Sequence, residues 1–186
     1  MQIRFRFDLT KTVQVLGYLL KGGPVDKVKL MKLVYLADRA HFIAHGTAIT
    51  GDQLCAMDFG PVPSHTLDAV SGNLQPSQVF RHLHVNDNKV ELRAAPGEDL
   101  LSEEEKQTLD QILAEHGCKG TWRLVRETHR LPEYVEAYVE GSSKTIPFER
   151  IAKFSGNPAR FRHERAVVSQ ESALQLRCPF DADDDL

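Results

Sequence analysis

The 186-residue sequence lacks the features that mark several large classes of protein. No apolar run approaches the roughly 18 residues that a membrane-spanning helix needs, and residues 1–8 alternate charged and apolar side chains instead of forming the apolar block of a signal peptide. The three cysteines are odd in number and widely spaced, so they support neither a disulfide framework nor a CxxC metal site. We therefore expect a reducing, cytoplasmic location.

The sequence also lacks a strongly basic segment. Residues 1–93 carry 11 basic and 8 acidic side chains, whereas residues 94–186 carry 12 basic and 18 acidic ones. The small positive excess of the first half is far weaker than the basic stripe of a dedicated nucleic-acid binder, so nucleic acid is not expected as a partner. Four of the acids lie between Asp181 and Asp185, so the acidic excess of the second half comes largely from the C-terminal tail.

Motifs for cofactor and metal chemistry are missing as well. The glycines fall at the ends of predicted elements and form no phosphate-binding loop, and no HExxH pattern occurs, so we expect neither a cofactor nor a metal. One alternative remains, because Asp38, His41 and His45 share a helix face and could converge on a metal as in a hydrolase. The polar flank of a buried helix explains these three residues equally well.

The sequence contains many signals for helix ends. Asp8, Asp26, Ser102 and Thr121 are candidate N-caps, and glycines follow several of the apolar stripes. The apolar positions of residues 26–46 cover more than one stripe, so this helix is expected to be central and buried on most sides. The predicted helices cover residues 8–21, 26–46, 64–70, 103–116, 121–129, 132–139, 147–151 and about 161–176.

Strand signals are few. Residues 53–59 read as a short extended segment, which residues 60–64, with two prolines, stop as a rigid bend. A hairpin is predicted within residues 79–95, around an Asn-Asp-Asn turn. The predicted class is therefore mainly α (α+β): a compact helical domain with a small two- or three-stranded antiparallel sheet or hairpin. We expect residues 1–158 to form one domain, and residues 159–186 to add a C-terminal helix and an acidic tail.

Other residues have more ordinary interpretations. Lys27, Lys29, Lys32 and Arg39 are expected to form a solvated helix face, balanced by nearby acids. Trp122 is expected to be a packing anchor.

Three separate segments are candidates for one polar cluster. Gly60 and Pro61 suit a tight turn passing near the central helix, where Tyr35 and Asp38 could meet it or the Thr128–His129 pair. Such a cluster is either a structural network or a site. An enzyme that uses Tyr35, Asp38 and His129 is the second catalytic alternative.

Several motifs together resemble one family. KLMKLVYLADR at residues 29–39, ITGD at 49–52, AMDFGPVPS at 56–64 and WRLVRETH at 122–129 are similar to the Panacea antitoxin domain, also called SocA-like. The resemblance covers about residues 10–155. It implies a mostly helical domain that neutralises a toxin, encoded by an adjacent gene, through direct binding. The motif residues that it marks as partner-binding or structural are Lys29, Lys32, Tyr35, Asp38, Arg39, Gly60, Pro61, Val62, Ser64, Trp122, Thr128 and His129.

The interpretation that follows from this resemblance is an antitoxin without catalytic activity. A prophage or mobile-element protein that binds a host factor is the alternative among binding functions. A toxin-masking interface is expected to centre on a few aromatic or arginine anchors. The aromatic candidates are Phe5, Phe7, Tyr18, Phe42 and Phe59.

Overall fold

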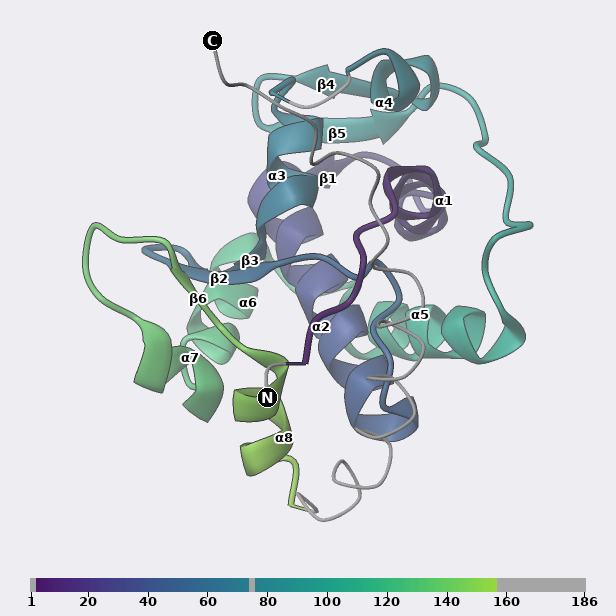
Figure 1. Cartoon of the computed structure of the whole chain (residues 1–186). Helices are drawn as coiled ribbons and strands as arrows, with labels where there is room; N and C mark the ends of the chain where they lie inside the picture. The colour runs from purple at the N-terminus through teal and green to yellow at the C-terminus, as the bar shows by residue number, and fades with distance from the viewer. Residues whose placement is uncertain (1–2, 74–75, 157–186) are drawn as a thin grey trace, which may run out of the picture.

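The computed structural model describes residues 3–73 and 76–156. Within these residues it contains eight helices and two three-stranded antiparallel sheets, which confirms the predicted mainly α class with a small sheet component. Figure 1 shows the long helix α2 (Lys27–His45) running through the centre of the molecule. The predicted helix at about residues 161–176 and the acidic tail lie outside the described residues.

The remaining elements surround α2. The other helices are α1 (Leu9–Leu19), α3 (Ser64–Val70), α4 (Pro76–His82), α5 (Glu103–His116), α6 (Thr121–Thr128), α7 (Pro132–Ala137) and α8 (Phe148–Phe154). The strands are β1 (Val25–Asp26), β2 (Leu54–Met57), β3 (Gly60–Pro63), β4 (Leu83–Asn86), β5 (Lys89–Leu92) and β6 (Lys144–Thr145).

Capping residues set the helix boundaries much as the sequence predicts. The Asp8 carboxylate accepts a hydrogen bond from the Lys11 N–H, and the Asp26 carboxylate accepts two at the start of α2. Ser102 and Glu105 form the reciprocal capping box of α5, which satisfies two otherwise unpaired N–H groups. The predicted cap at Thr121 is wrong by one position, because α6 begins at Thr121 and Gly120 precedes it as the N-cap without a side-chain bond.

The first sheet has the strand order β1-β5-β4 and contains the predicted hairpin. Its turn places Asp87 at a φ of 49°, a left-handed conformation that aspartate tolerates better than most residues. The hairpin is shorter than predicted, because residues 79–82 belong to the unpredicted helix α4.

The second sheet has the order β3-β2-β6 and corrects the interpretation of residues 60–64. Gly60–Pro63 is not a bend that ends the extended segment but a strand that pairs antiparallel with β2. Pro61 and Pro63 fit there because β3 is an edge strand. No further strand pairs with its outer side, so a proline that lacks an N–H group on that side removes no hydrogen bond of the sheet.

Two apolar clusters form the core, and α2 contributes to both. Leu30 and Val34 join α1, α5 and the first sheet in one cluster, while Tyr35 and Phe42 join β2, α7 and α8 in the other. The predicted central position of this helix is therefore confirmed. Within residues 3–73 and 76–156, no helix combines the length and apolar character that crossing a bilayer requires.

Candidate functional site

The turn between β2 and β3 packs closely against α2. Lys32 Nζ donates a 2.8 Å hydrogen bond to the carbonyl oxygen of Pro61. Gly60 has a φ of 96°, and a Cβ at this position would lie 3.0 Å from atoms of Thr128 and His129 and 3.2 Å from Lys32 Cε. The predicted approach of Gly60 and Pro61 to the central helix is present, and Lys32 is the side chain that meets the turn.

The Lys32 side chain is fully buried. Burial lowers the pKa of its amine to about 7, because the ammonium form loses its hydration there. In the described part of the chain no carboxylate pairs with it. The solvated face expected for the basic residues of α2 is therefore wrong at Lys32.

Lys29 and Arg39 also depart from that expectation. Lys29 Nζ donates to the carbonyl oxygen of Gly117 at 2.6 Å and so ties α2 to the end of α5. Arg39 Nε pairs with the Glu133 carboxylate at 2.5 Å. Both side chains are half-buried and satisfy groups on neighbouring helices.

Glu133 is fully buried and connects two residues of α2 to α7. Its Oε1 accepts hydrogen bonds from the Tyr35 hydroxyl at 3.1 Å and from Arg39. Burial and the negative charge of Glu133 raise the pKa of Tyr35, so this phenol remains protonated. Glu133 Oε2 has no hydrogen-bond partner among the described residues.

Asp38 holds the loop that follows α2. Its carboxylate accepts hydrogen bonds from the N–H groups of Ile49 and Thr50, both at 2.9 Å, and from the Thr50 hydroxyl. Burial raises the pKa of Asp38 to about 6, although these donors act in the opposite direction. The carboxylate is thus engaged in shaping the loop.

The metal alternative needs Asp38, His41 and His45 to converge. His41 Nδ1 instead lies 2.7 Å from the Thr47 carbonyl oxygen, and the His41 ring packs against that of His45 with centroids 4.6 Å apart. Across residues 3–73 and 76–156, no group of three or more His, Cys, Asp or Glu side chains has a metal-binding arrangement.

The second catalytic alternative, with Tyr35, Asp38 and His129, is not assembled in the described structure either. Tyr35 bonds Glu133 and Asp38 bonds the 49–50 loop, whereas the His129 ring stacks on Tyr134 with centroids 4.9 Å apart. Thr128 donates its hydroxyl to carbonyl oxygens within α6. Burial, followed by the nearby Lys32, lowers the pKa of His129, and its Nε2 lacks a partner among the described residues.

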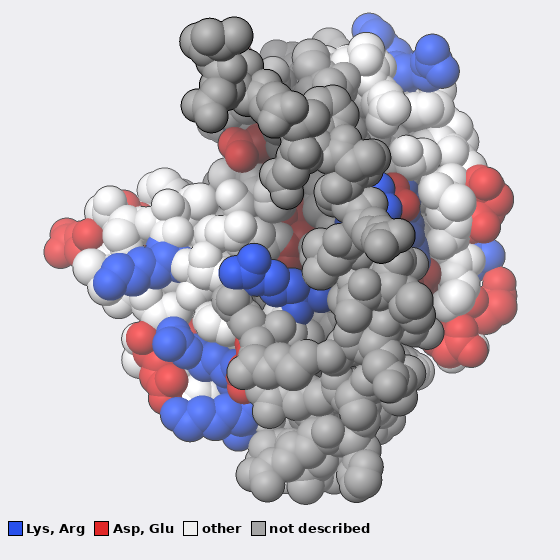
Figure 2. Space-filling model, in the orientation of Figure 1, with Lys and Arg blue, Asp and Glu red and all other residues white. Residues whose placement is uncertain are grey.

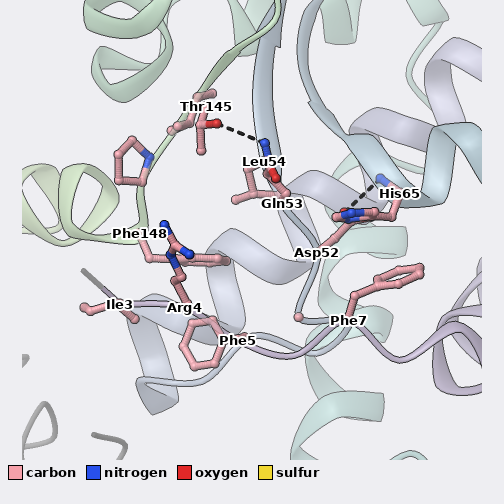
Figure 3. Close-up of a pocket in the computed structure, with 13 residues that line it drawn as sticks. Ile3, Arg4, Phe5, Phe7, Asp52, Gln53, Leu54, His65, Thr145 and Phe148 are labelled. Carbon is pink, nitrogen blue, oxygen red and sulfur yellow. Dashed lines mark hydrogen bonds and ion pairs between the residues drawn. The ribbon is translucent and has the colours of Figure 1, made fainter. Parts of the chain in front are cut away.

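A pocket of about 380 Å³ lies between the N-terminal segment and β2 (Figure 3). At one side, the buried Asp52 carboxylate bonds His65 Nδ1 at 2.8 Å, and Phe7 stacks on the His65 ring. Asp52 also accepts the N–H groups of His65 and Thr66 at the start of α3. Through these bonds Asp52 connects the segment before β2 to the first turn of α3.

A second pocket, of about 310 Å³, lies beside the β2–β3 turn. We call it the Lys32 pocket. Its lining residues are Lys27, Val28, Met31, Lys32, Met57, Asp58, Phe59, Val62 and Leu67.

Phe59, which lines the Lys32 pocket, and Trp122 form an exposed aromatic pair. Phe59 is 55% exposed and Trp122 is 61% exposed, and their rings pack edge to face with centroids 5.8 Å apart. The expected packing anchor at Trp122 is therefore wrong, because its ring covers another surface side chain and not the core. In Figure 2, uncharged side chains predominate on the left-hand lobe, where Figure 1 places β2, β3 and β6.

Bonds from α7 and the following residues hold the turn that carries Phe59. Tyr134 donates its hydroxyl to the Met57 carbonyl oxygen at 2.9 Å. Asp58 accepts hydrogen bonds from the Tyr138 hydroxyl at 3.0 Å and from the Gly141 N–H at 3.1 Å.

The other motif residues and anchor candidates have different positions. Val62 lines the Lys32 pocket, while Ser64 begins α3 and donates its N–H to the Gln53 carbonyl oxygen. Of the aromatic candidates for anchors, only Phe59 is exposed. Phe5 and Phe7 are half-buried, and Tyr18 and Phe42 are buried.

Sequence reasoning did not select Glu133 and Asp52 as site residues. Glu133 follows Pro132 in the first turn of α7, where an acid is favoured by the helix dipole, so its local sequence context suggests an exposed residue. For Asp52 the sequence held one signal. Asp52 precedes β2, and the antiparallel strand β3 brings the start of α3 back beside it. Neither local sequence shows that the carboxylate is buried.

Comparison with known proteins identifies one family. The family described as antitoxin SocA-like, Panacea domain, matches residues 30–133. This range runs from the first half of α2 to Glu133 and includes Lys32, the β2–β3 turn, Trp122 and His129. No curated protein and no solved structure gives a significant match.

Proposed function

Because the chain belongs to the SocA-like antitoxin family with a Panacea domain, we propose that it neutralises a protein toxin by binding it directly. The toxin is encoded by an adjacent gene in a bacterial or phage toxin–antitoxin locus, and the encounter takes place in the cytoplasm. Residues 1–158 form the antitoxin domain in this proposal, and residues 159–186 flank it.

The exposed Phe59–Trp122 pair carries the proposal. Large aromatic side chains at the surface cost free energy in water, and they are enriched among the anchors of protein interfaces. This pair adjoins an apolar pocket and a lobe with few charged side chains. Exposed Val135 and Val139 lie in and just after α7, which is bonded to the same turn. We call this combination of Phe59, Trp122 and the Lys32 pocket the docking surface.

Action by binding, without catalysis, agrees with the hydrogen bonds of three buried carboxylates. Asp38, Glu133 and Asp52 each accept several hydrogen bonds that connect elements of the fold. A general acid or base must reach a substrate proton, and these carboxylates are engaged with the protein itself.

Coexpression tests the function. The adjacent open reading frame is induced in a host cell with or without this protein, and growth is followed. We expect growth arrest that this protein relieves. Arrest that persists with every candidate neighbour would count against toxin neutralisation, and a harmless neighbour in a phage gene cluster would favour binding of a host factor.

Variants of the anchors test the docking surface. Phe59→Ala and Trp122→Ala are each expected to weaken toxin binding about 30-fold or more, since hot-spot truncations cost about 2 kcal/mol or more. The matched control is Leu100→Ala, which removes a 41% exposed apolar side chain three residues before α5. Figure 1 shows α5 on the opposite side of α2 from β2 and β3. Titration calorimetry measures the Kd, and urea unfolding verifies that each variant is folded. Equal binding by all three variants would place the interface elsewhere.

A further inference from the structure

Arginine side chains cover the exposed face of α6 beside Trp122. Arg123 and Arg126 lie within this helix, and Arg130 follows its C-cap, His129. The three arginines are exposed, and we call them the arginine face. Arginine and tryptophan are both enriched among the residues that dominate the binding energy of protein interfaces. Their combination here indicates a surface that binds a partner.

The arginine face is continuous with the docking surface. Arg126 lies one turn after Trp122 on α6, and a helical side chain leans toward the N-terminus, so the two side chains share one stripe. The Trp122 ring contacts Phe59, which lines the Lys32 pocket. At the other end of α6, His129 packs against the β2–β3 turn immediately before Arg130. An apolar pocket and three cations therefore belong to one surface.

Two of the three arginines have no acidic partner. Within residues 3–73 and 76–156, neither Arg126 nor Arg130 forms an ion pair. Arg123 pairs with Glu127 at 3.0 Å, but its side chain is 64% exposed, and such a surface pair contributes little. Glu127 also pairs with Lys119 at 2.7 Å, so this one acid is shared by two cations. The arginine face thus has a net positive charge.

The other charges of the docking surface do not cancel this excess. Lys27 lines the Lys32 pocket and is a further cation. Asp58 is the acid of the lining, and its carboxylate accepts two hydrogen bonds within the protein. The amine of Lys32 is buried and bonds the Pro61 carbonyl oxygen, so the pocket itself presents apolar walls. A complementary partner therefore has an apolar group for the pocket and negative charges outside it.

We infer that the toxin binds through an acidic surface that surrounds one protruding apolar side chain. This inference rests on the proposed function. The apolar side chain would enter the Lys32 pocket beside Phe59, and neighbouring carboxylates of the toxin would pair with Arg126 and Arg130. Opposite charges around an interface speed association and exclude partners of the wrong charge.

Nucleic acid is the other polyanion that exposed arginines attract. A protein is favoured, because Phe59 and Trp122 pack edge to face on each other beside an apolar pocket, whereas single-strand binders present aromatic faces on which successive bases stack. Fluorescence anisotropy with labelled 20-nucleotide RNA and DNA tests this at 150 mM NaCl. We expect no binding at about 10 μM protein. Micromolar binding that Arg126→Gln abolishes would overturn the inference.

Association kinetics with the product of the adjacent open reading frame test the acidic partner. At 50 mM NaCl the double variant Arg126→Gln/Arg130→Gln is expected to associate about tenfold more slowly, with less than about threefold change in dissociation, because rim charges act mainly on the encounter. At 500 mM NaCl salt screens exposed charges, so the difference in association rate should shrink to less than about twofold.

Arg81→Gln is the matched control for the arginine face. Arg81 is an exposed arginine of α4 that, like Arg126, forms no ion pair in the described part of the chain. Figure 1 shows α4 beside β4 and β5, away from α6. This variant is expected to change the association rate less than about twofold. Equal rates for the double variant and the control would overturn the inference.

Charge reversal identifies the paired groups. Arg126→Glu is expected to weaken toxin binding about 30-fold, since like charges then face each other across the interface. Replacing one acid on the toxin surface by lysine should restore the binding of this variant to within about threefold of the wild-type pair. Failure of every such toxin variant to restore binding would contradict the acidic surface.

The same measurements separate this inference from the proposed function. If the arginine variants bind like the control while Phe59→Ala binds weakly, the antitoxin function stands and the acidic partner is wrong. If the wild-type protein binds no toxin, the proposed function fails and this inference fails with it.

Discussion

Gly60 passes so close to His129 that a Cβ on the glycine would lie 3.0 Å from Cδ2 of the imidazole. The same Cβ would contact the Thr128 hydroxyl and Lys32, and the φ of 96° disfavours any residue with a side chain. The β2–β3 turn therefore has its present position against α2 and α6 because residue 60 has no side chain.

Substitution of Gly60 by alanine is expected to destabilise the protein. The new methyl group would strain the backbone and push against the end of α6, so the free energy of unfolding should fall by more than about 1 kcal/mol. Gly22→Ala is the control, because a Cβ there meets no atom within 4 Å. Urea unfolding of both variants measures the difference, and equal stability would contradict the tight approach.

Loss of Glu133 is expected to have a larger effect. Glu133→Ala leaves Arg39 and Tyr35 without their shared acceptor, and breaking such a buried pair costs about 3–5 kcal/mol. Tyr35→Phe removes one hydrogen bond and should cost about 1 kcal/mol.

Glu136→Ala provides the matched control for Glu133. Glu136 pairs with Lys153 and Arg150 at the surface, where an ion pair contributes about 0–1 kcal/mol. Thermal or urea unfolding compares these variants. A cost at Glu133 no larger than at Glu136 would show that the buried network does not stabilise the fold.

Asp38 should make stability depend on pH in an identifiable way. Burial raises the pKa of Asp38 in the folded protein to about 6, above its ordinary value of 3.8, so the folded state holds this proton more tightly than the unfolded state. Its contribution to stability is therefore present below about pH 4 and is lost as the pH rises through 6.

Comparison with Asp38→Asn isolates this contribution, because the other titrating groups are common to both proteins. From pH 7 to pH 4 the wild type should gain up to about 3 kcal/mol relative to the variant. A difference that stays constant over this range would show that the pKa of Asp38 is not raised.

Lys32 should produce the opposite dependence. Its pKa is about 7 in the folded protein and 10.5 ordinarily, so between these values the unfolded chain binds a proton that the folded protein has lost. The stability of the wild type relative to Lys32→Met should therefore rise with pH, by up to about 4 kcal/mol between pH 7 and pH 10. Urea unfolding at both pH values measures it, and equal differences would mean that Lys32 remains charged or is solvated.

Local signals in the sequence were sufficient to predict most of the helices. Asp26, Ser102 and Gly46 act on backbone groups within four residues, so their effects can be read from the sequence alone. The two prolines of β3 misled the prediction, since a proline is compatible with a strand only at a sheet edge, and edge position depends on the complete topology.

The candidate site was harder to predict because burial is a tertiary property. Lys32 and Lys27 are the same residue type on one helix, yet one is completely buried and the other is half-buried. For Trp122 the error has the opposite direction, because the prediction was burial and the side chain is exposed. An aromatic residue in a short amphipathic helix is usually buried. The family resemblance identified the motif residues, but it did not indicate which of them face the surface.

Asp58 holds the turn beside Phe59 through bonds from the Tyr138 hydroxyl and the Gly141 N–H. The backbone next to the aromatic anchor is therefore ordered before any partner arrives. Binding then loses little conformational entropy at this position, because the backbone does not have to be ordered when the partner binds. The two hydrogen bonds of Asp58 would thus contribute to affinity without contacting the toxin.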